Sequence, residues 1–357
     1  MPELDSIRGL AILAVLFYHG LYWKVDLSPF SPFARVVLNT FRLGRLGVSL
    51  FFVLSGFLIT GLLLDSRDRP DYYWRFYVRR ALRILPAYLL TIVVLASLRY
   101  APAAFLVMSL AYLSNLTPLF GVPIAYPILW SLAVEEHFYF LWPVLTRKLG
   151  EKGLAVLSIL VVCLSPVSRL IGFWNLHGVN NFVFHEYTWN SADGLACGAL
   201  LAIFLRRYRC SRRSLVLLSV ILCLIAAAIW IVGFPSGILT RQTAVGASLQ
   251  IVPCHFVFVA LIVVFLLLGV GKWKFLVHTP VLKVFGDISY GLYLCHLLVF
   301  EGVGWLWKIG PFRPLHANAL GSLVIRFIVA ATLAVLIALL SRRQFENRFL
   351  RLKSRLT

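Results

Sequence analysis

The chain has 357 residues, of which 61% are hydrophobic and only 13% are charged, whereas soluble domains average about 45–50% apolar and about 25% charged residues. This composition excludes a soluble globular enzyme and a disordered chain. Lys and Arg number 34 against 14 Asp and Glu, a net charge of +20, and the basic residues lie between apolar runs, which indicates the cytosolic loops of a membrane protein rather than nucleic-acid binding.

About ten apolar runs are long enough to cross a bilayer, since a span needs roughly 20 residues. In chain order they cover about residues 6–24, 44–65, 82–100, 129–146, 153–174, 188–205, 214–233, 249–270, 284–307 and 319–340. Glu3 and Asp5 precede the first run and no A-x-A cleavage site ends it, so we interpret it as a span rather than a signal peptide. The sequence therefore predicts an all-α, polytopic bundle of transmembrane helices.

The run 103–119 is shorter and is broken by Pro118. If it does not cross, most of the 34 basic residues fall on one side together with both termini, as the positive-inside rule requires. If it crosses, the basic residues of every later loop change sides. We therefore expect both termini in the cytosol and 103–119 to be re-entrant or to lie along the outer interface. No hydrophilic stretch is long enough for a second domain, so we expect 1–357 to form a single transmembrane domain.

The six cysteines are scattered along the chain, with no C-x-x-C pair and no spacing typical of metal ligands. We expect neither a disulfide framework nor a metal site, and no permanently bound cofactor.

Ionisable residues within apolar runs are costly in lipid and are the first candidates for function. They are Glu135, Glu136, Asp193, Glu301, His19, His255, His296 and Arg326. At ~1.5 Å per residue, His19 lies ~20 Å from the inner face and Glu135 ~10 Å from the outer face of a ~30 Å core, so their depths coincide. The other two histidines, Asp193 and Arg326 fall in the same outer half. Hydrogen bonding between helices is the alternative reading for some of them.

Helix geometry predicts which of these residues share a face. Arg8 and His19 are eleven residues apart, which corresponds to three helical turns plus ~20°. The cation at the cytosolic end of the span and the imidazole deep inside it therefore lie on the same face of the helix. Arg80 and Arg83 lie one turn apart and can hold a phosphate by charge-assisted hydrogen bonds. Two alternatives stay open. Arg8 could serve only to fix the topology as a positively charged cytosolic residue, and the arginine pair could be solvated cytosolic side chains that bind no donor.

Glu135 and Glu136 point about 100° apart, so only one of them can face a cavity centre. Ser131, Tyr139 and Trp142 share the face of Glu135, at i−4, i+4 and i+7. We therefore expect Glu135 to be the cavity-facing acid.

Six ordered motifs resemble those of the membrane acyltransferase-3 family, multi-span O-acyltransferases that act on glycans, lipids and some secondary metabolites. They read LDSIRGLAILAVLFYH, FFVLSGFLIT, RRALRILPAYLL, LWSLAVEEHFYFLWP, DGLACGALLA and ISYGLYLCH, followed by a C-terminal FEN. By this resemblance Arg8 and His19 match the family's motif of an arginine and a histidine separated by ten residues, and the arginine pair and the adjacent glutamates match two further motifs. His137 stands where glutamine is usual, and the common proline after Glu346 is missing. Because the chain ends soon after the last span, we expect no appended hydrolase-like domain.

The resemblance implies an acyl donor, commonly acyl-CoA, on the cytosolic side and often an acceptor hydroxyl on the other. We expect an O-acyltransferase that moves an acyl group, with acetyl as the expected one, to a glycan, lipid-linked saccharide or metabolite. His19 would act as general base or transient acyl carrier, and Glu135 would stabilise its imidazolium. The donor phosphates would be held by Arg8, Arg80 and Arg83. Candidates for the acceptor or its pocket are Glu136, Tyr139, Asp193, Ser289, Tyr293 and His296.

We expect an integral protein of the bacterial inner membrane, with acyl-CoA as co-substrate and no nucleic-acid partner; assembly into a homo-oligomer stays open. Two other functions also stay open. A transporter or flippase for an anionic substrate would place ionisable groups at similar depths, although the two halves show none of the self-similarity of inverted repeats. A catalytically inactive assembly subunit is the third reading.

Overall fold

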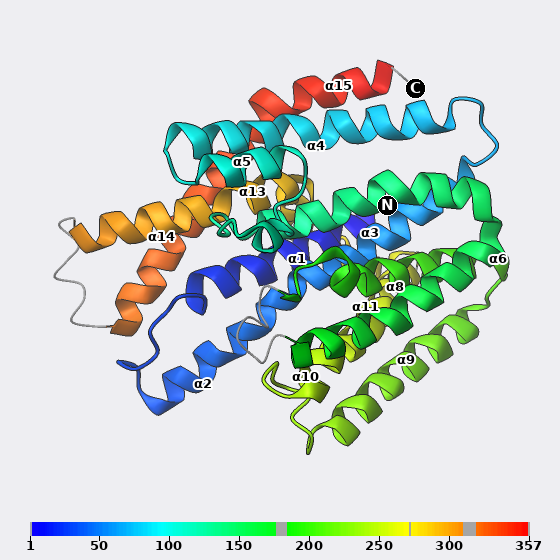
Figure 1. The fold of residues 1–357 in the computed structure, drawn as a ribbon, viewed down its shortest axis with the longest axis horizontal. Coiled ribbons are helices and arrows are strands. Elements are labelled where there is room, and N and C mark those ends of the chain that lie inside the picture. The colour runs from blue at the N-terminus through cyan, green and yellow to red at the C-terminus, as the bar shows by residue number, and fades with distance from the viewer. Residues whose placement is uncertain (1, 176–183, 271–272, 310–318, 356–357) are drawn as a thin grey trace. The chain divides into compact units, whose positions relative to one another are not determined.

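The computed structural model describes residues 2–175, 184–270, 273–309 and 319–355 (Figure 1). It divides into two compact units. The first unit consists of residues 1–48, 78–91 and 278–357, and the second of residues 49–77 and 92–277. No strand occurs within the described ranges, which agrees with the predicted all-α class.

The first unit combines the two ends of the chain with the middle of α4 (Tyr72–Ser97). Its other elements are α1 (Pro2–Leu21), α2 (Pro32–Thr40), the 3₁₀ turn η1 (Phe41–Arg45), α13 (Pro280–Ile309), α14 (Ala319–Ser341), the π-helical turn η4 (Arg342–Glu346) and α15 (Asn347–Arg355). Helix α13 packs against both α1 and α14 (Figure 1).

Two glycines bring α1 and α13 into close contact. A Cβ atom on Gly9 would lie 2.2 Å from the carbonyl oxygen of Leu282, and one on Gly286 would lie 2.0 Å from that of Asp5. Small residues allow helix backbones to approach closely inside membranes. The two glycines therefore allow the backbones of α1 and α13 to contact each other directly.

The second unit holds most of the middle of the chain. Its elements are most of α3 (Leu46–Asp65), the two ends of α4, α5 (Ala103–Leu110), η2 (Thr117–Phe120), α6 (Leu129–Asn175), α8 (Thr188–Arg207), α9 (Arg212–Gly233), α10 (Ala244–Leu249), α11 (Val252–Gly269) and α12 (Lys274–Val277). Helix α8 packs on α6, and α9 packs on α11 (Figure 1). Gly56 of α3 meets the Leu195 carbonyl of α8, where a Cβ atom would lie only 1.9 Å away, so this small residue serves close helix packing.

Nine helices within the described residues are long and apolar enough to cross a membrane. The longest, α6, has 47 residues but contains two helical segments, because Gly150 leaves the helical region with φ 67° and ψ 179°. Its two segments match the predicted spans 129–146 and 153–174. Counted this way, the structure confirms the prediction of about ten spans.

The run 103–119 contains only short helices. Helix α5 has eight residues, about 12 Å at 1.5 Å per residue, against a ~30 Å hydrocarbon core. The four residues of η2 add a separate turn. Neither is long enough to cross, in agreement with the prediction for this run.

Two helix boundaries differ most from the prediction. Helix α4 begins at Tyr72, ten residues before the expected start at 82, because the basic residues of this stretch are good helix formers that a hydropathy pattern does not register. Helical structure also continues beyond the expected end at 340, through η4 and α15. The apolar run therefore marks the part of a helix that suits lipid rather than the whole helix.

Candidate active site

Two of the predicted site residues, His19 and His296, lie next to each other in the first unit. His19 lies in the last turn of α1, with its Nδ1 3.2 Å from Nε2 of His296 on α13. The same Nδ1 lies 3.0 Å from the Val15 carbonyl oxygen. Nδ1 of His296, a fully buried residue, lies 2.7 Å from the Tyr293 carbonyl and 3.1 Å from that of Leu292.

These contacts assign the protons on both rings. Carbonyl oxygens only accept hydrogen bonds, so Nδ1 of each histidine carries a proton and donates it. Nε2 of His296 must then accept the bond from His19, since two facing N–H groups would repel each other. The ring of His296 is therefore neutral, and in the neutral form of His19 the lone pair that a general base requires lies on Nε2.

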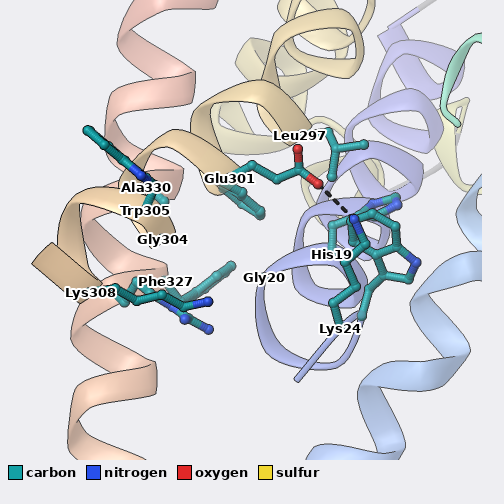
Figure 2. Close-up of a pocket in the computed structure, with 13 residues that line it drawn as sticks. His19, Gly20, Lys24, Leu297, Glu301, Gly304, Trp305, Lys308, Phe327 and Ala330 are labelled. Carbon is teal, nitrogen blue, oxygen red and sulfur yellow. Dashed lines mark hydrogen bonds and ion pairs between the residues drawn. The ribbon is translucent and has the colours of Figure 1, made fainter. Parts of the chain in front are cut away.

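A cavity of about 250 Å³ lies beside His19, between the ends of α1, α13 and α14 (Figure 2). Its lining combines charged and aromatic side chains: Lys24, Glu301, Lys308, Arg326, Trp23, Phe300, Trp305 and Phe327. Lys24 Nζ lies 3.0 Å from Glu301 Oε1 (Figure 2). The sequence identified Glu301 and Arg326 as ionisable residues within spans, but it did not predict that they line the same cavity. The lysines and tryptophans gave no separate signal, because such residues are common at the ends of any span.

Arg8 and His19 lie on one continuous helix, so the predicted shared face of α1 is retained. The guanidinium of Arg8 donates to the carboxylate of Asp5, one turn earlier, and both side chains are partly exposed. Arg8 is thus held by a neighbour on its own helix at the end of α1 opposite to His19.

Arg80 and Arg83 lie partly buried in the segment of α4 that belongs to the first unit. The Tyr290 hydroxyl of α13 donates to the Ile84 carbonyl at 3.0 Å and ties this segment to the unit. All three arginines predicted to bind the donor therefore belong to the same unit as His19.

Glu135 lies on the buried face of α6 in the second unit. The three residues predicted to share its face, Ser131, Tyr139 and Trp142, are all buried. The Ser55 hydroxyl of α3 donates to Glu135 Oε1 at 2.8 Å. The orientation of Glu135 toward a cavity stays a prediction, since Glu135 and Glu136 are both half-buried.

Glu136 lies one residue further around α6. On its face Leu132 is buried but Phe140 is 71% exposed, so this face contains both buried and exposed side chains. The expected partnership of Glu135 with His19 joins residues of different units and stays a prediction.

Asp193 is already paired within the second unit. Its Oδ2 lies 2.9 Å from Nη1 of Arg169 and 3.6 Å from Nδ1 of His255, and all three residues are buried. A buried carboxylate requires such a partner. The sequence identified Asp193 and His255 but not Arg169 as members of one cluster. A role of Asp193 in the acceptor pocket stays a prediction.

The other candidates on α13, Ser289 and Tyr293, are buried on the side that carries His296. The Ser289 hydroxyl donates to the Gly286 carbonyl at 2.8 Å, which satisfies it within its own helix. Tyr293 supports the ring of His296, with ring centroids 5.7 Å apart.

His137, which replaces the usual glutamine of the resembled motif, is part of a polar link in the second unit. Its Nδ1 lies 2.6 Å from the Thr188 hydroxyl, which also accepts from Asn115 at 2.9 Å. The imidazole thus links α6 to the start of α8, a structural role.

Glu186 lies outside the membrane-spanning helices, just before α8, and is 8% exposed. Its Oε2 has no hydrogen-bond partner among the residues that the structure describes. Burial raises the pKa of this carboxyl to about 8, although the charge of Arg241 lowers it in part. Glu186 is therefore a buried acid outside the predicted site.

No group of three His, Cys, Asp or Glu side chains in the described ranges is arranged to hold a metal ion.

A family model described as an acyltransferase domain matches residues 1–343. The chain belongs to the acyltransferase-3 family. This match identifies it as an acyltransferase domain, and its apolar helices make it an integral membrane protein. The resemblance seen in the six motifs is thus confirmed over nearly the whole chain.

Three curated bacterial relatives match parts of the chain. YrhL of Bacillus subtilis is 35% identical over 188 residues, which cover 46% of this chain and 27% of the relative. The peptidoglycan O-acetyltransferase OatA of Listeria monocytogenes is 32% identical over 163 residues, 40% of this chain and 24% of the relative. The O-acetyltransferase OatA of Staphylococcus aureus is 28% identical over 225 residues, which cover 57% of this chain and 34% of the relative. The matches thus span about a quarter to a third of these relatives. No solved structure matches the chain significantly.

Proposed function

We propose that this chain is a membrane O-acetyltransferase that moves an acetyl group from cytosolic acetyl-CoA to a hydroxyl of a cell-envelope glycan. The observation that carries this proposal is the His19 imidazole at a polar, aromatic cavity, where Nδ1 is bonded to His296 and the lone pair of the neutral ring therefore lies on Nε2. The names of two relatives, an O-acetyltransferase and a peptidoglycan O-acetyltransferase, support the acyl group and the acceptor class.

Arg8, Arg80 and Arg83 are the proposed donor site. The phosphates of CoA are the strongest anions in the reaction, and guanidinium groups bind phosphate through paired, charge-assisted hydrogen bonds. Arg8 lies at the end of α1 opposite to His19. The flexible pantetheine arm of CoA would carry the thioester along α1 toward the imidazole.

The proposed reaction begins with the hydroxyl of the acceptor. Nε2 of His19 takes the hydroxyl proton while the oxygen attacks the thioester carbonyl carbon. The carbon–sulfur bond then breaks, and the thiolate of CoA takes the proton back from the imidazolium. General-base catalysis of this kind typically contributes ~100- to 10,000-fold. His296 would act as a positioning residue, because its Nε2 accepts from Nδ1 of His19 in both the neutral and the charged form.

A covalent route uses the same atoms. Nε2 of His19 would attack the thioester, CoA would leave, and the acceptor hydroxyl would then take the acetyl group from the ring. Incubation with labelled acetyl-CoA in the absence of acceptor separates the routes, because only the covalent route labels the protein at His19.

Glu135 is the proposed source of negative charge that stabilises the imidazolium. A carboxylate nearby favours the charged form of histidine. The Ser55 hydroxyl, which donates to Glu135 Oε1, would hold the carboxylate in place.

The proposed location is the bacterial cytoplasmic membrane, with the donor on the cytosolic side and the glycan on the other. A transporter or flippase is the competing function. Acetyl transfer by detergent-solubilised protein needs no gradient, so its detection excludes transport as the sole function.

The decisive experiment uses purified full-length protein, labelled acetyl-CoA and bacterial glycan as acceptor. We expect transfer by the wild type and none by His19→Ala, with unchanged acetyl-CoA binding by equilibrium dialysis. His278→Ala is the matched control, since it removes a histidine of the same unit that pairs with Glu3 instead. Appreciable turnover by purified His19→Ala would rule out both the general-base and the acyl-histidine routes.

A further inference from the structure

The cavity beside His19 carries more positive than negative charge. Three cations, Lys24, Lys308 and Arg326, line it together with one acid, Glu301. Lys24 is paired with Glu301 at 3.0 Å. Lys308 and Arg326 form no ion pair with the residues that the structure describes. Two positive charges are therefore available to a ligand in this cavity.

Basic residues at the ends of spans are often interfacial anchors, so the position of each cation matters. Lys308 lies in the last turn of α13 and fits that description. Arg326 does not, because it lies seven residues after the start of α14, ~10 Å along the helix axis. Its side chain is partly buried and lines the cavity instead.

The wall that carries Arg326 is held in place by close packing. A Cβ atom on Gly20 would lie 2.3 Å from the ring of Phe327, so the absence of a side chain at Gly20 allows α14 to contact α1 beside His19. The adjacent Arg326 is thus placed by a fixed contact between two helices rather than by a loop.

Aromatic rings complete the lining. Trp23 packs edge-on against His19 with ring centroids 5.4 Å apart, and Trp305 lines the cavity from α13. Flat aromatic surfaces pack well against the apolar face of a pyranose ring. The cavity is at the small end of ligand-pocket volumes, so it suits one sugar unit rather than a long chain.

We infer that this cavity selects an acceptor sugar that carries an anionic group, a carboxylate or a phosphate, near the hydroxyl to be acetylated. Arg326 and Lys308 bind the anion, and the indole rings hold the sugar while its hydroxyl meets His19. This inference rests on the proposed function, because it names the acceptor class of the same site.

The test compares acceptors that differ in charge. The full-length protein in nanodiscs receives labelled acetyl-CoA and one of three oligosaccharides of equal length: peptide-free peptidoglycan strands, whose muramic acid carries a lactyl carboxylate; chito-oligosaccharide, which lacks it; and chito-oligosaccharide 1-phosphate. We expect the KM for at least one anionic acceptor to be roughly 10- to 100-fold below that for the neutral one, as one charge-assisted hydrogen bond provides. Comparing the KM of the carboxylate-bearing acceptor with that of the phosphate-bearing acceptor shows which of the two anions the cavity binds.

Two variants connect this preference to the cavity. Arg326→Gln and Lys308→Gln should each raise the KM for the preferred anionic acceptor by about the same factor, so that the ratio of the neutral-acceptor KM to the anionic-acceptor KM falls toward 1. Lys283→Gln, which removes an exposed lysine near the opposite end of α13, is the matched control. The wild-type preference should also weaken at high salt.

The outcomes separate this inference from the proposed function. Equal KM values for neutral and anionic acceptors, or a preference that both glutamine variants retain, would overturn the anion site and leave acetyl transfer intact. Failure to acetylate any of the three oligosaccharides would count against the glycan acetyltransferase itself, and the anion site would be rejected with it.

Discussion

Nδ1 of His19 and Nε2 of His296 lie 3.2 Å apart, and backbone carbonyls near both Nδ1 atoms determine the direction of this hydrogen bond. In the proposed reaction His296 therefore resembles the carboxylate of a catalytic triad, because it orients the ring of His19 and accepts from its imidazolium. The acceptor here is a neutral imidazole on a neighbouring helix.

This relationship predicts different effects for two substitutions of His296. His296→Leu removes the acceptor and should lower kcat by ~100-fold or more, because the ring of His19 loses the side chain that orients it and accepts from its imidazolium. His296→Gln keeps an amide oxygen close to the former Nε2 and should retain most of kcat. Steady-state kinetics of both variants, with their thermal stabilities measured in parallel, checks this. Equal loss in two stably folded variants would contradict the role of His296 as hydrogen-bond acceptor for His19.

The arginines of α4 should act on donor binding. Arg80→Ala or Arg83→Ala removes charge-assisted hydrogen bonds of roughly 1.5–3 kcal/mol, so we expect the KM for acetyl-CoA to rise about 10- to 100-fold, most strongly at low salt, with little change in kcat. Arg343→Ala, at an exposed position in η4, is the control. A donor KM that stays constant in both α4 variants would show that the pair is only a topological collar.

The two adjacent glutamates should differ in effect. Glu135→Gln keeps the shape of the side chain but removes the charge, so turnover should fall by orders of magnitude and the pH optimum should move, because an opposite charge no longer favours the imidazolium. Glu136→Gln should act mainly through folding, since it lies on a different face of α6. Parallel pH–rate profiles test this. The assignment is wrong if Glu136→Gln is inactive and Glu135→Gln behaves like the wild type.

Glu186 should make the stability of the protein depend on pH. Its pKa of about 8 in the folded state lies above the ordinary value of 4.5 because the carboxyl is buried. The folded state therefore holds this proton more tightly, and the contribution of Glu186 to stability is lost as the pH rises from about 4.5 to about 8. Glu186→Gln does not titrate, so it should be more stable than the wild type at pH 9, by on the order of a few kcal/mol, and gain no such advantage near pH 4.5. Thermal unfolding in detergent at both pH values measures this. A stability difference that does not change with pH would contradict the raised pKa.

The sequence alone determined the class of the fold and the helices that build it. Apolar runs of sufficient length must become helices in lipid, because every backbone polar group there needs a partner within its own segment. The same local geometry predicted the shared face of Arg8 and His19 and the face that Glu135 shares with three other residues of α6, since helix phase depends only on spacing along one chain segment.

Tertiary structure decided which of these faces meet. The partner of His19 is 277 residues away, and the close approach of α1 and α13 depends on glycines whose spacing carries no signal of its own. The buried pair of Arg169 with Asp193 and the cations around Glu301 likewise join separate helices. A sequence pattern reports the preference of one helix for lipid or for protein, whereas a hydrogen bond between two helices depends on their rotation and relative height, which packing determines.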